Sequence, residues 1–566
     1  MQVTFSYNFI ISIRSNPFSC RSRGLQKCSI GARSTMSQVL GQLCAQVAGD
    51  TFGPVVKSVV KYLFVAGTRP LMAIVVNSPY QRNEVKLAVQ VLLQHHLVTF
   101  GVARTGAADY TLHPQRVLLL LRYSRFLLLI RTRFGSQQEV LLDELLRQGQ
   151  DTAFNIVVRA TKRINESMEE GGKAVPAATI RDKFLEMVRG QYFQRCATVA
   201  PPADATAAPP ADATVAPPAE GVPQLLEVEG ERAFAPPQLD MGVVQRAVDG
   251  KPGRPPPPDP VRWRVNFSRL DEEFRDQLVL HSVSRTCGEP AADVMRHLMA
   301  LAAQASPAWA PTSNPVSLTE LKDRLARLAG TVHADAVSYS EQYVRIMSEG
   351  ETPYLSRYGD AGGGQYVLNM KRILQNFGWA VAENVVQERF GSRAGRIFRL
   401  IRAKRYVEQD KIHEWAMIPP KEAKLLTYQL HRATFVNVCD LRKPGQQVTP
   451  GRVVILFHLD ANHLTRMLIE TCYRALLNML TSRADETSRH QRLHDKQLRV
   501  ESILATLREQ GAGDDQLAEV EEALTEPERA ELARAAAVTD KLSLAELQLD
   551  QTLFLLQTCL KYSAMK

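Results

Sequence analysis

One order of secondary-structure patterns recurs along this chain, and it limits the folds that the chain can adopt. Each copy has three stretches with apolar residues at helical spacing, followed by two short stretches with strand character. In the first copy the strands are expected at residues 97–102 and 110–112, on either side of a turn at Arg104. Three helices followed by a two-stranded hairpin form the plan of a winged helix, in which two of the helices make a helix-turn-helix unit.

The fourth copy has the clearest pattern. Helices are predicted around residues 397–401, 410–415 and 421–432, and a turn at Met417 to Pro420 separates the last two. The apolar positions expected in the third of these helices are Ala423, Leu425, Leu426 and Leu430. Two strands should flank a wing rich in Pro and Gly at residues 443–451. The other copies are less regular, and the wing of the second is expected to be short or lost.

Capping residues mark several expected helix ends. Asn83 is expected to be the N-cap of the third helix in the first copy. Three further pairs fit capping boxes, in which each side chain accepts from a free amide of the other residue: Ser317 with Glu320, Thr525 with Glu528, and Ser543 with Glu546. Because two of these boxes fall after residue 520, the C-terminal arm is expected to consist of several helical pieces.

The pattern from residue 463 to the end is entirely helical. Apolar residues repeat at roughly heptad spacing over residues 464–480, and the apolar stripe resumes at Val500. Between these stretches residues 483–497 are polar and charged, which suits docking on another protein rather than self-pairing. A second arm after Gly511 should fold back on the first, so an antiparallel coiled-coil hairpin is predicted.

A tract rich in Pro and Ala interrupts the series of copies. The string Ala-Pro-Pro-Ala-Asp-Ala-Thr begins at Ala200 and recurs from Ala208, and such a composition forms an exposed linker. The expected fold is mainly α with small β-hairpin wings, as four tandem winged-helix domains followed by a C-terminal antiparallel coiled coil. The expected boundaries are a basic N-terminal extension at 1–35, winged helices at 36–114 and 115–197, the linker at 198–260, winged helices at 261–370 and 371–460, and the coiled-coil hairpin at 461–566.

The formal net charge of the chain is +10, and a basic chain favours polyanionic partners. Residues 1–35 supply five basic residues and no acidic one, so the rest is only mildly basic and nucleic-acid contact should be local. This extension is similar to an organellar transit peptide, but a true start at Met36 is favoured. No apolar run is long enough to span a membrane, and the eight cysteines are too scattered for a zinc site.

The sequence contains no pattern of catalytic residues. Gly362-Gly363-Gly364 lacks the Lys and Ser or Thr of a phosphate-binding loop and is interpreted as a hairpin tip. His458 and His463 flank Asp460, but no third ligand converges on them. We therefore expect no catalytic residue, no cofactor and no metal, and the chain is not expected to be an enzyme in its own right.

Basic side chains on the expected recognition helices and wings are the best candidates for a binding surface. Lysine and arginine at such positions suit contacts with DNA phosphates. An acidic protein partner fits them equally well, and a solvated helix face is the simplest interpretation. The candidates are Arg389, Arg393, Arg396, Lys421, Lys424 and Arg432 in the fourth copy, Lys86 and Arg104 in the first, and Lys443 in the last wing.

Several strings identify a family that the chain resembles. The most specific are Val385-Val-Gln-Glu-Arg-Phe-Gly-Ser-Arg-Ala-Gly-Arg-Ile-Phe-Arg-Leu400 and Ala416-Met-Ile-Pro-Pro-Lys-Glu-Ala-Lys424. Further matches are Phe274-Arg-Asp-Gln277 and the ending Gln548-Leu-Asp-Gln-Thr-Leu-Phe-Leu-Leu556. Together these strings resemble the third-largest subunit of RNA polymerase III, over about residues 36–566 apart from the linker.

The resemblance implies a non-catalytic subunit of DNA-directed RNA polymerase III in the nucleus. In that family the subunit forms a heterotrimer with two smaller polymerase III subunits, similar in plan to the factor TFIIE, on the clamp of the largest subunit. The resemblance further implies support for promoter opening and transcription initiation at tRNA, 5S rRNA and other small RNA genes. Contact with DNA near the transcription bubble would then be weak and not sequence-specific.

The alternative is a free-standing DNA-binding transcription regulator with tandem winged helices. Such regulators usually present polar and basic recognition helices that read base edges. Here the helices expected at residues 83–95 and 177–189 carry few side chains of that kind. This composition favours winged helices that dock on protein.

Overall fold

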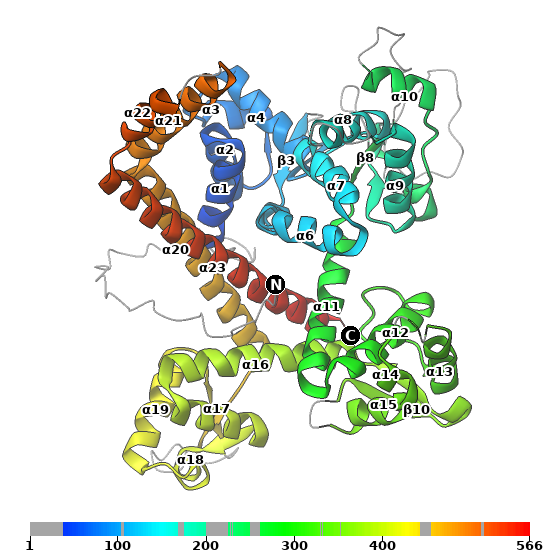
Figure 1. Ribbon diagram of the computed structural model, residues 1–566. Helices are drawn as coiled ribbons and strands as arrows, with labels where there is room; N and C mark the ends of the chain where they lie inside the picture. The colour runs from blue at the N-terminus through cyan, green and yellow to red at the C-terminus, as the bar shows by residue number, and fades with distance from the viewer. Residues whose placement is uncertain are drawn as a thin grey trace. The chain divides into compact units, whose positions relative to one another are not determined.

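The computed structural model describes residues 38–102, 107–167, 175–199, 225–226, 228, 230–249, 261–328, 330, 332–350, 353–441, 454–510 and 514–565. They fall into two compact units, residues 38–275 and the described residues from 276 on, and each is considered by itself. The described fold is mainly helical, with four three-stranded antiparallel sheets and one two-stranded sheet (Figure 1). The prediction of a mainly α protein with small β elements is confirmed. None of the described helices combines the length and apolar character needed to cross a membrane.

The first part of the N-terminal unit has the expected order of elements. It contains α1 (Gln38–Phe52), α2 (Pro54–Ala66), β1 (Arg69–Pro70), α3 (Leu71–Val76), α4 (Arg82–Gln94), β2 (Val98–Val102) and β3 (Ala108–Leu112). The sheet has the order β1-β3-β2, and β2 and β3 form the predicted hairpin. The helices bury the side chains that the spacing predicts, among them Val59 of α2 and Val89 of α4.

The second part of the N-terminal unit includes one strand that follows the linker in the sequence. Its elements are α5 (Pro114–Leu118), η1 (Leu119–Arg122), α6 (Tyr123–Phe134), α7 (Ser136–Gln148), β4 (Asp151–Thr152), α8 (Ala153–Glu166), α9 (Ala177–Arg189), β5 (Phe193–Arg195), β6 (Thr198–Val199), β7 (Leu225–Leu226), η2 (Gly230–Phe234), α10 (Met241–Val248) and β8 (Arg262–Val265). β8 pairs with both β4 and β5. The prediction of a short or lost wing is therefore wrong, because the strand that completes this sheet was assigned by sequence to the third domain.

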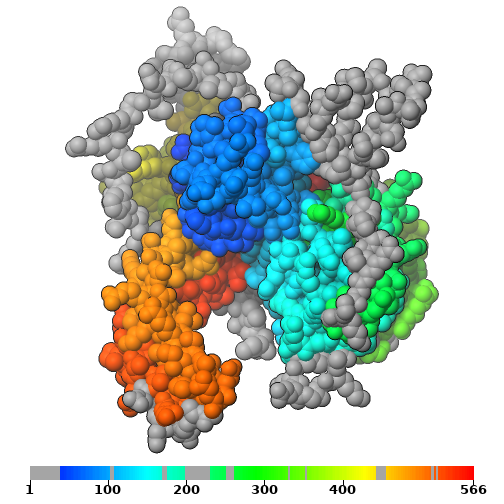
Figure 2. Space-filling view, turned by 90° about the horizontal axis from the view of Figure 1, so that it is seen from above, coloured from blue at the N-terminus to red at the C-terminus, as the bar shows by residue number. Residues whose placement is uncertain are grey.

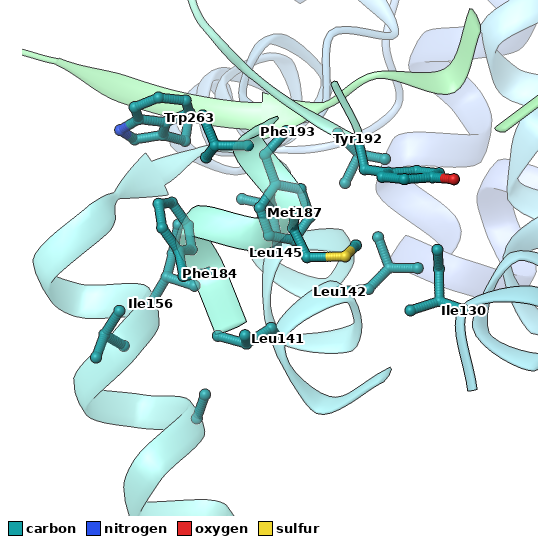
Figure 3. Close-up of a cluster of buried hydrophobic side chains, with 14 of the residues drawn as sticks. Ile130, Leu141, Leu142, Leu145, Ile156, Phe184, Met187, Tyr192, Phe193 and Trp263 are labelled. Carbon is teal, nitrogen blue, oxygen red and sulfur yellow. The ribbon is translucent and has the colours of Figure 1, made fainter. Parts of the chain in front are cut away.

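Trp263 of β8 belongs to the apolar core of this part (Figure 3). The side chain is fully buried, and its ring meets Phe184 of α9 edge-on with the ring centroids 5.6 Å apart. Phe184 also packs on Phe193 of β5, while Leu141 and Ile156 belong to the same cluster. Burial of large apolar side chains is the main favourable contribution to folding, so β8 is an integral part of this domain.

The next part begins with a helix, α11, in which the boundary between the two units falls after Arg275. Its elements are α11 (Phe267–Cys287), α12 (Glu289–Ala305), β9 (Val316–Ser317), α13 (Leu318–Arg327), α14 (Ala334–Ser338), α15 (Ser340–Glu349), β10 (Leu355–Gly359), η3 (Ala361–Gly363) and β11 (Gln365–Leu368). The sheet has the order β10-β11-β9. Gly362 has a φ of 63°, and a Cβ there would clash with the Ser317 hydroxyl. The interpretation of the three glycines as a hairpin tip is confirmed.

Two predicted N-caps differ from the observed ones. α4 begins at Arg82 rather than after Asn83, because the Glu84 side chain accepts a hydrogen bond of 3.3 Å from the Gln81 amide in a capping box. Ser317 does precede α13, but its hydroxyl donates to the Gly362 carbonyl at 3.1 Å and makes no capping bond to the helix. The capping box predicted at Ser317 is therefore wrong, since the hairpin tip competes for the same hydroxyl.

The fourth pattern folds as predicted. It forms α16 (Met370–Phe390), α17 (Ser392–Lys404), β12 (Tyr406–Glu408), α18 (Gln409–Ala416), α19 (Pro420–Arg432), β13 (Asn437–Leu441) and β14 (Val454–His458). The sheet has the order β12-β14-β13, so the two expected strands pair with each other, and β14 also pairs with β12. The three predicted helices are confirmed. The wing between β13 and β14 lies outside the described residues.

A helical hairpin ends the chain. It consists of α20 (Ala461–Arg489), α21 (Gln491–Glu509), α22 (Asp514–Glu522) and α23 (Glu526–Ala564), and the orange and red segments form one elongated body (Figure 2). α20 and α23 are antiparallel, because Ser563 donates to Asn462 at 2.6 Å while Arg483 pairs with Glu546 at 2.7 Å. The predicted hairpin is confirmed.

The capping predictions in this hairpin have opposite outcomes. Thr525 and Glu528 form the predicted capping box at the start of α23. The box predicted at Ser543 is wrong, because α23 continues through it as one helix of 39 residues. Glu546 is instead buried and pairs with Arg483 across the hairpin, so tertiary packing decides its role.

Candidate interaction surface

α17, α18 and α19, drawn in yellow in Figure 1, position most of the basic candidates. Pro420 begins α19, where its missing amide hydrogen would have no partner within the helix. One side of α19 is buried at Ala423, Thr427 and Leu430. The opposite side, which we term the α19 face, is exposed and consists of Lys421, Lys424, Leu425, Tyr428 and Arg432.

The candidate arginines before α19 make contacts within the domain. Arg393 forms an ion pair with Glu422 of α19, and this hydrogen bond raises the pKa of Arg393. Arg396 donates to the Ala416 carbonyl at 3.2 Å, and the guanidinium of Arg389 lies 5.8 Å from the Phe390 ring centroid. Arg393 and Arg396 therefore connect α17 with α19 and α18, whereas Arg389 contacts its neighbour within α16.

Other cations of α17 are engaged in the same way. Arg399 pairs with Glu383 of α16 at 3.1 Å, and Arg402 lies 5.1 Å from the Trp379 ring centroid. The Lys404 ammonium lies 5.4 Å from the ring of Trp415, a cation–π contact that brings a positive charge beside an aromatic surface. Most basic side chains of α17, the helix that is richest in arginine, thus have contacts within their own domain.

The cations of the α19 face differ from those of α17. Lys421, Lys424 and Arg432 are exposed, and they make no ion pair within the described residues. Lys86 of α4 is also exposed without an ion pair in that part of the chain. The wing candidates Arg104 and Lys443 lie outside the described residues.

Several apolar side chains on this surface were not identified from the sequence. Leu425 was expected in the apolar stripe of α19, but it is exposed. At about 100° per residue, Leu425 lies on the opposite side of the helix from Ala423. Helical spacing could therefore have predicted that Leu425 is exposed. Trp415, Met417 and Tyr428 are likewise exposed, and the same angular spacing places Tyr428 on the side of Leu425.

The N-terminal unit contains a cavity of about 290 Å³ that is lined in part by two adjacent histidines, His95 and His96. It is lined by apolar side chains such as Leu145 and Phe267, and by Arg116 and Arg264 among the polar ones. Burial lowers the pKa of His95 and of His96 to about 4, and for His96 the nearby Arg264 and Arg116 add to the effect. Both imidazoles are therefore neutral at pH 7.

The histidines do not form a metal site in the described structure. The nearest sulfur partner of His96 is Cys196, with Nε2 and Sγ 3.8 Å apart. Across the residues that the structure describes, no group of three His, Cys, Asp or Glu side chains could hold a metal ion.

These features define a class of protein: a mainly helical chain of helix-turn-helix and winged-helix domains that ends in a helical hairpin. Four family models match segments of the chain, and the domains that they describe agree with this class. They are the RNA polymerase III subunit RPC82 helix-turn-helix domain at residues 42–103, RNA polymerase III subunit RPC82 at 236–377, the C-terminal winged-helix domain of POLR3C at 382–459, and the helical hairpin domain of DNA-directed RNA polymerase III subunit RPC3 at 492–555.

Whole-length relatives give the particular family. The chain is 31% identical over 541 residues to DNA-directed RNA polymerase III subunit RPC3 of Bos taurus, which covers 94% of this chain and 100% of the relative. The Homo sapiens protein of that name is 30% identical over 533 residues, covering 92% of this chain and 98% of the relative. The Danio rerio protein is 30% identical over 537 residues, covering 91% and 97%. The chain therefore belongs to the RPC3 family of RNA polymerase III subunits, and the resemblance stated from sequence is confirmed.

Proposed function

We propose that this chain is a non-catalytic subunit of nuclear DNA-directed RNA polymerase III that supports transcription initiation. The observation that carries the proposal is the 31% identity to an RPC3 protein, which extends over 94% of the chain. The similarity therefore extends over every type of domain that the structure describes and is not limited to a single domain. The proposed role is assembly and positioning, with nucleotide addition left to other subunits.

Within the polymerase, the chain is proposed to act in a heterotrimer with two smaller subunits on the clamp. Four winged-helix domains would supply the binding surfaces, and the second of them includes β8. The hairpin at 461–566 is proposed to be an antiparallel coiled coil that docks on another protein. In support, α21 carries mostly exposed polar and charged side chains, and Leu504 is its one buried residue among those described.

The heterotrimer is proposed to assist promoter opening through weak contacts with DNA that are not sequence-specific. Lys86, Arg104 and Lys443 are the proposed phosphate contacts, because they belong to a recognition helix or to wings. Arg389, Arg393 and Arg396 are assigned a positioning role, in keeping with their contacts inside the domain. For Lys421, Lys424 and Arg432 both a phosphate and an acidic protein would be suitable partners.

The proposal is tested by purifying the tagged chain from its native cells at physiological salt and identifying the associated proteins by mass spectrometry. The expected result is recovery of the large polymerase III subunits with two small partners. Recovery of the chain alone on defined DNA sites would replace the proposal with a free-standing winged-helix regulator. A truncation after Leu459 removes the hairpin and is expected to reduce polymerase association strongly, whereas deletion within the Pro- and Ala-rich tract at 200–221 serves as the matched control.

A further inference from the structure

Large apolar side chains are exposed in the helix-turn-helix of α18 and α19. Trp415 is 46% exposed, Met417 86%, Leu425 55% and Tyr428 61%. Single exposed apolar residues are ordinary on protein surfaces, but several within one short segment form a patch, and such patches mark interaction sites. The patch therefore requires an explanation beyond the packing of the domain.

The apolar and basic residues of α19 share one side of the helix. Lys421, Lys424, Leu425 and Tyr428 follow one another at spacings of one and three to four residues, which places them on one face. The core uses the other side, at Ala423, Thr427 and Leu430. The α19 face is thus available to a partner without any rearrangement of the domain.

The turn before α19 places Met417 in the left-handed region, with φ 52° and ψ 50°. This conformation ends α18, because the Met417 and Ile418 amides both donate to the His413 carbonyl, as is common at helix C-termini. Its cost, roughly 1–2 kcal/mol for a residue with a Cβ, is therefore offset in part within the domain. The Met417 side chain, by contrast, is almost completely exposed. Contact of this side chain with a partner would explain its exposure.

The composition of the surface favours protein over DNA. Leucine has no hydrogen-bonding side-chain group with which to read base edges, and Leu425 lies in the middle of the α19 face. Two arginines that would extend a phosphate-binding surface are engaged, Arg393 by Glu422 and Arg396 by the Ala416 carbonyl. A surface with central apolar groups and surrounding charges has the layout of a protein–protein interface.

The charges of the surface indicate the chemistry of the partner. Lys421, Lys424 and Arg432 are exposed and make no ion pair in the part of the chain that the structure describes. The single carboxylate of α19, Glu422, is held by Arg393 and cannot neutralise them at the same time. A complementary surface must therefore bring negative charge beside apolar groups.

We propose that the α19 face, together with Trp415 and Met417, docks a protein segment that presents bulky apolar side chains flanked by Asp or Glu. The apolar anchors supply most of the affinity, and the acidic residues meet the lysines and fix the orientation. This inference rests on the proposed function, because it places the segment in another subunit of the polymerase assembly.

The inference is tested by hydroxyl-radical labelling of Met417 and Tyr428 in the full-length chain. Labelling is compared between the chain alone, the purified polymerase assembly without nucleic acid, and the same assembly with promoter DNA. The expected result is a several-fold decrease in both residues in the DNA-free assembly, while the buried Met295 stays unreactive throughout. Unchanged labelling in the assembly, or a decrease only after DNA is added, would overturn the inference.

The two proposals fail in distinguishable ways. If the chain does not purify with the polymerase, the proposed function fails and this inference fails with it. If the chain is present in the polymerase but Met417 and Tyr428 stay reactive, only the inference fails. Both outcomes are read from the same preparation.

A cross-linking experiment tests the chemistry of the partner. Tyr428 is replaced by the photoreactive p-benzoylphenylalanine, and the cross-linked peptide from the DNA-free assembly is sequenced. The expected peptide contains bulky apolar residues with Asp or Glu nearby, whereas a basic segment would contradict the proposal. Leu425→Ser and Lys424→Glu should each lower the cross-link yield several-fold, and the charge reversal Arg327→Glu on exposed α13 should leave it unchanged.

Discussion

Arg483 of α20 is joined to Glu546 of α23 by an ion pair in which Nη1 and Oε2 are 2.7 Å apart. The Glu546 side chain is only 9% exposed, so its charge is largely removed from water. Arg483→Ala should therefore leave a buried carboxylate without this partner. We expect the free energy of opening the hairpin to fall by ~1–3 kcal/mol, less than for a fully buried pair because Arg483 is partly exposed.

Hydrogen exchange of the α20 and α23 amides in the full-length chain measures this change. Arg489→Ala is the matched control, because Arg489 is exposed and pairs with Glu486 of its own helix. The control should change the free energy of opening by less than about 1 kcal/mol, as exposed ion pairs contribute little. Equal exchange in both variants would show that the Arg483–Glu546 pair does not stabilise the hairpin.

The elements that the sequence predicts well are those with local, periodic signals. The buried positions Ala423, Thr427 and Leu430 follow helical spacing, so α19 could be located without knowledge of its neighbours. β8 could not be assigned in this way, because its four residues alternate between basic and apolar as in a strand but do not show which strands they pair with. Its place follows only from the partners β4 and β5 and from the buried Trp263, which are contacts distant in sequence.

The candidate site was predicted less completely than the fold, for the same reason. A basic residue in the sequence carries no sign of the partner that it will meet. Arg393 and Lys424 are both basic residues of the same domain. Arg393 forms an ion pair with Glu422, whereas Lys424 makes no ion pair within the described residues. Similarly, a capping motif at Ser543 is a local signal, and the packing of α23 along α20 overrides it.

Trp263→Ala tests whether β8 is part of the N-terminal unit. The side chain is fully buried and contacts Phe184, so its loss should leave a cavity and lower the unfolding free energy by ~3–5 kcal/mol. Thermal unfolding followed by circular dichroism, with hydrogen exchange at β4 and β5, measures the effect. Trp415→Ala is the control, because Trp415 is exposed on the other unit. A similar loss in both variants would contradict the central role of Trp263.

Gly362→Ala tests the hairpin tip at η3. The residue has a φ of 63°, and the added Cβ would clash with the Ser317 hydroxyl. We expect a loss of ~1–2 kcal/mol from the left-handed conformation, with faster exchange of the β9 and β11 amides. Gly330→Ala should have no such effect, because no atom lies within 4 Å of the added Cβ and its φ is not in the positive range. Equal stability of the two variants would show that the tip can relax.

The stability of the N-terminal unit should depend on pH through His95 and His96. The pKa of each imidazole is lowered to about 4, by burial for His95 and by burial together with the nearby Arg264 and Arg116 for His96. A histidine in the unfolded chain has a pKa of roughly 6.5. As the pH falls from 6.5 towards 4, the unfolded chain binds protons that the folded chain does not, so folding is progressively disfavoured. Between pH 7 and pH 5 we expect a loss of ~2 kcal/mol per histidine.

Denaturation curves of the full-length chain at pH 7 and pH 5, with hydrogen exchange to resolve the N-terminal unit, measure this dependence. The double variant His95→Gln, His96→Gln should lose less stability between the two pH values than the parent, whatever its stability at pH 7. His463→Gln, at an exposed position of α20, should keep the parental dependence. Parallel pH profiles for the parent and the double variant would assign the acid sensitivity to other groups, because the two buried imidazoles would then be protonated equally in the folded and unfolded chains.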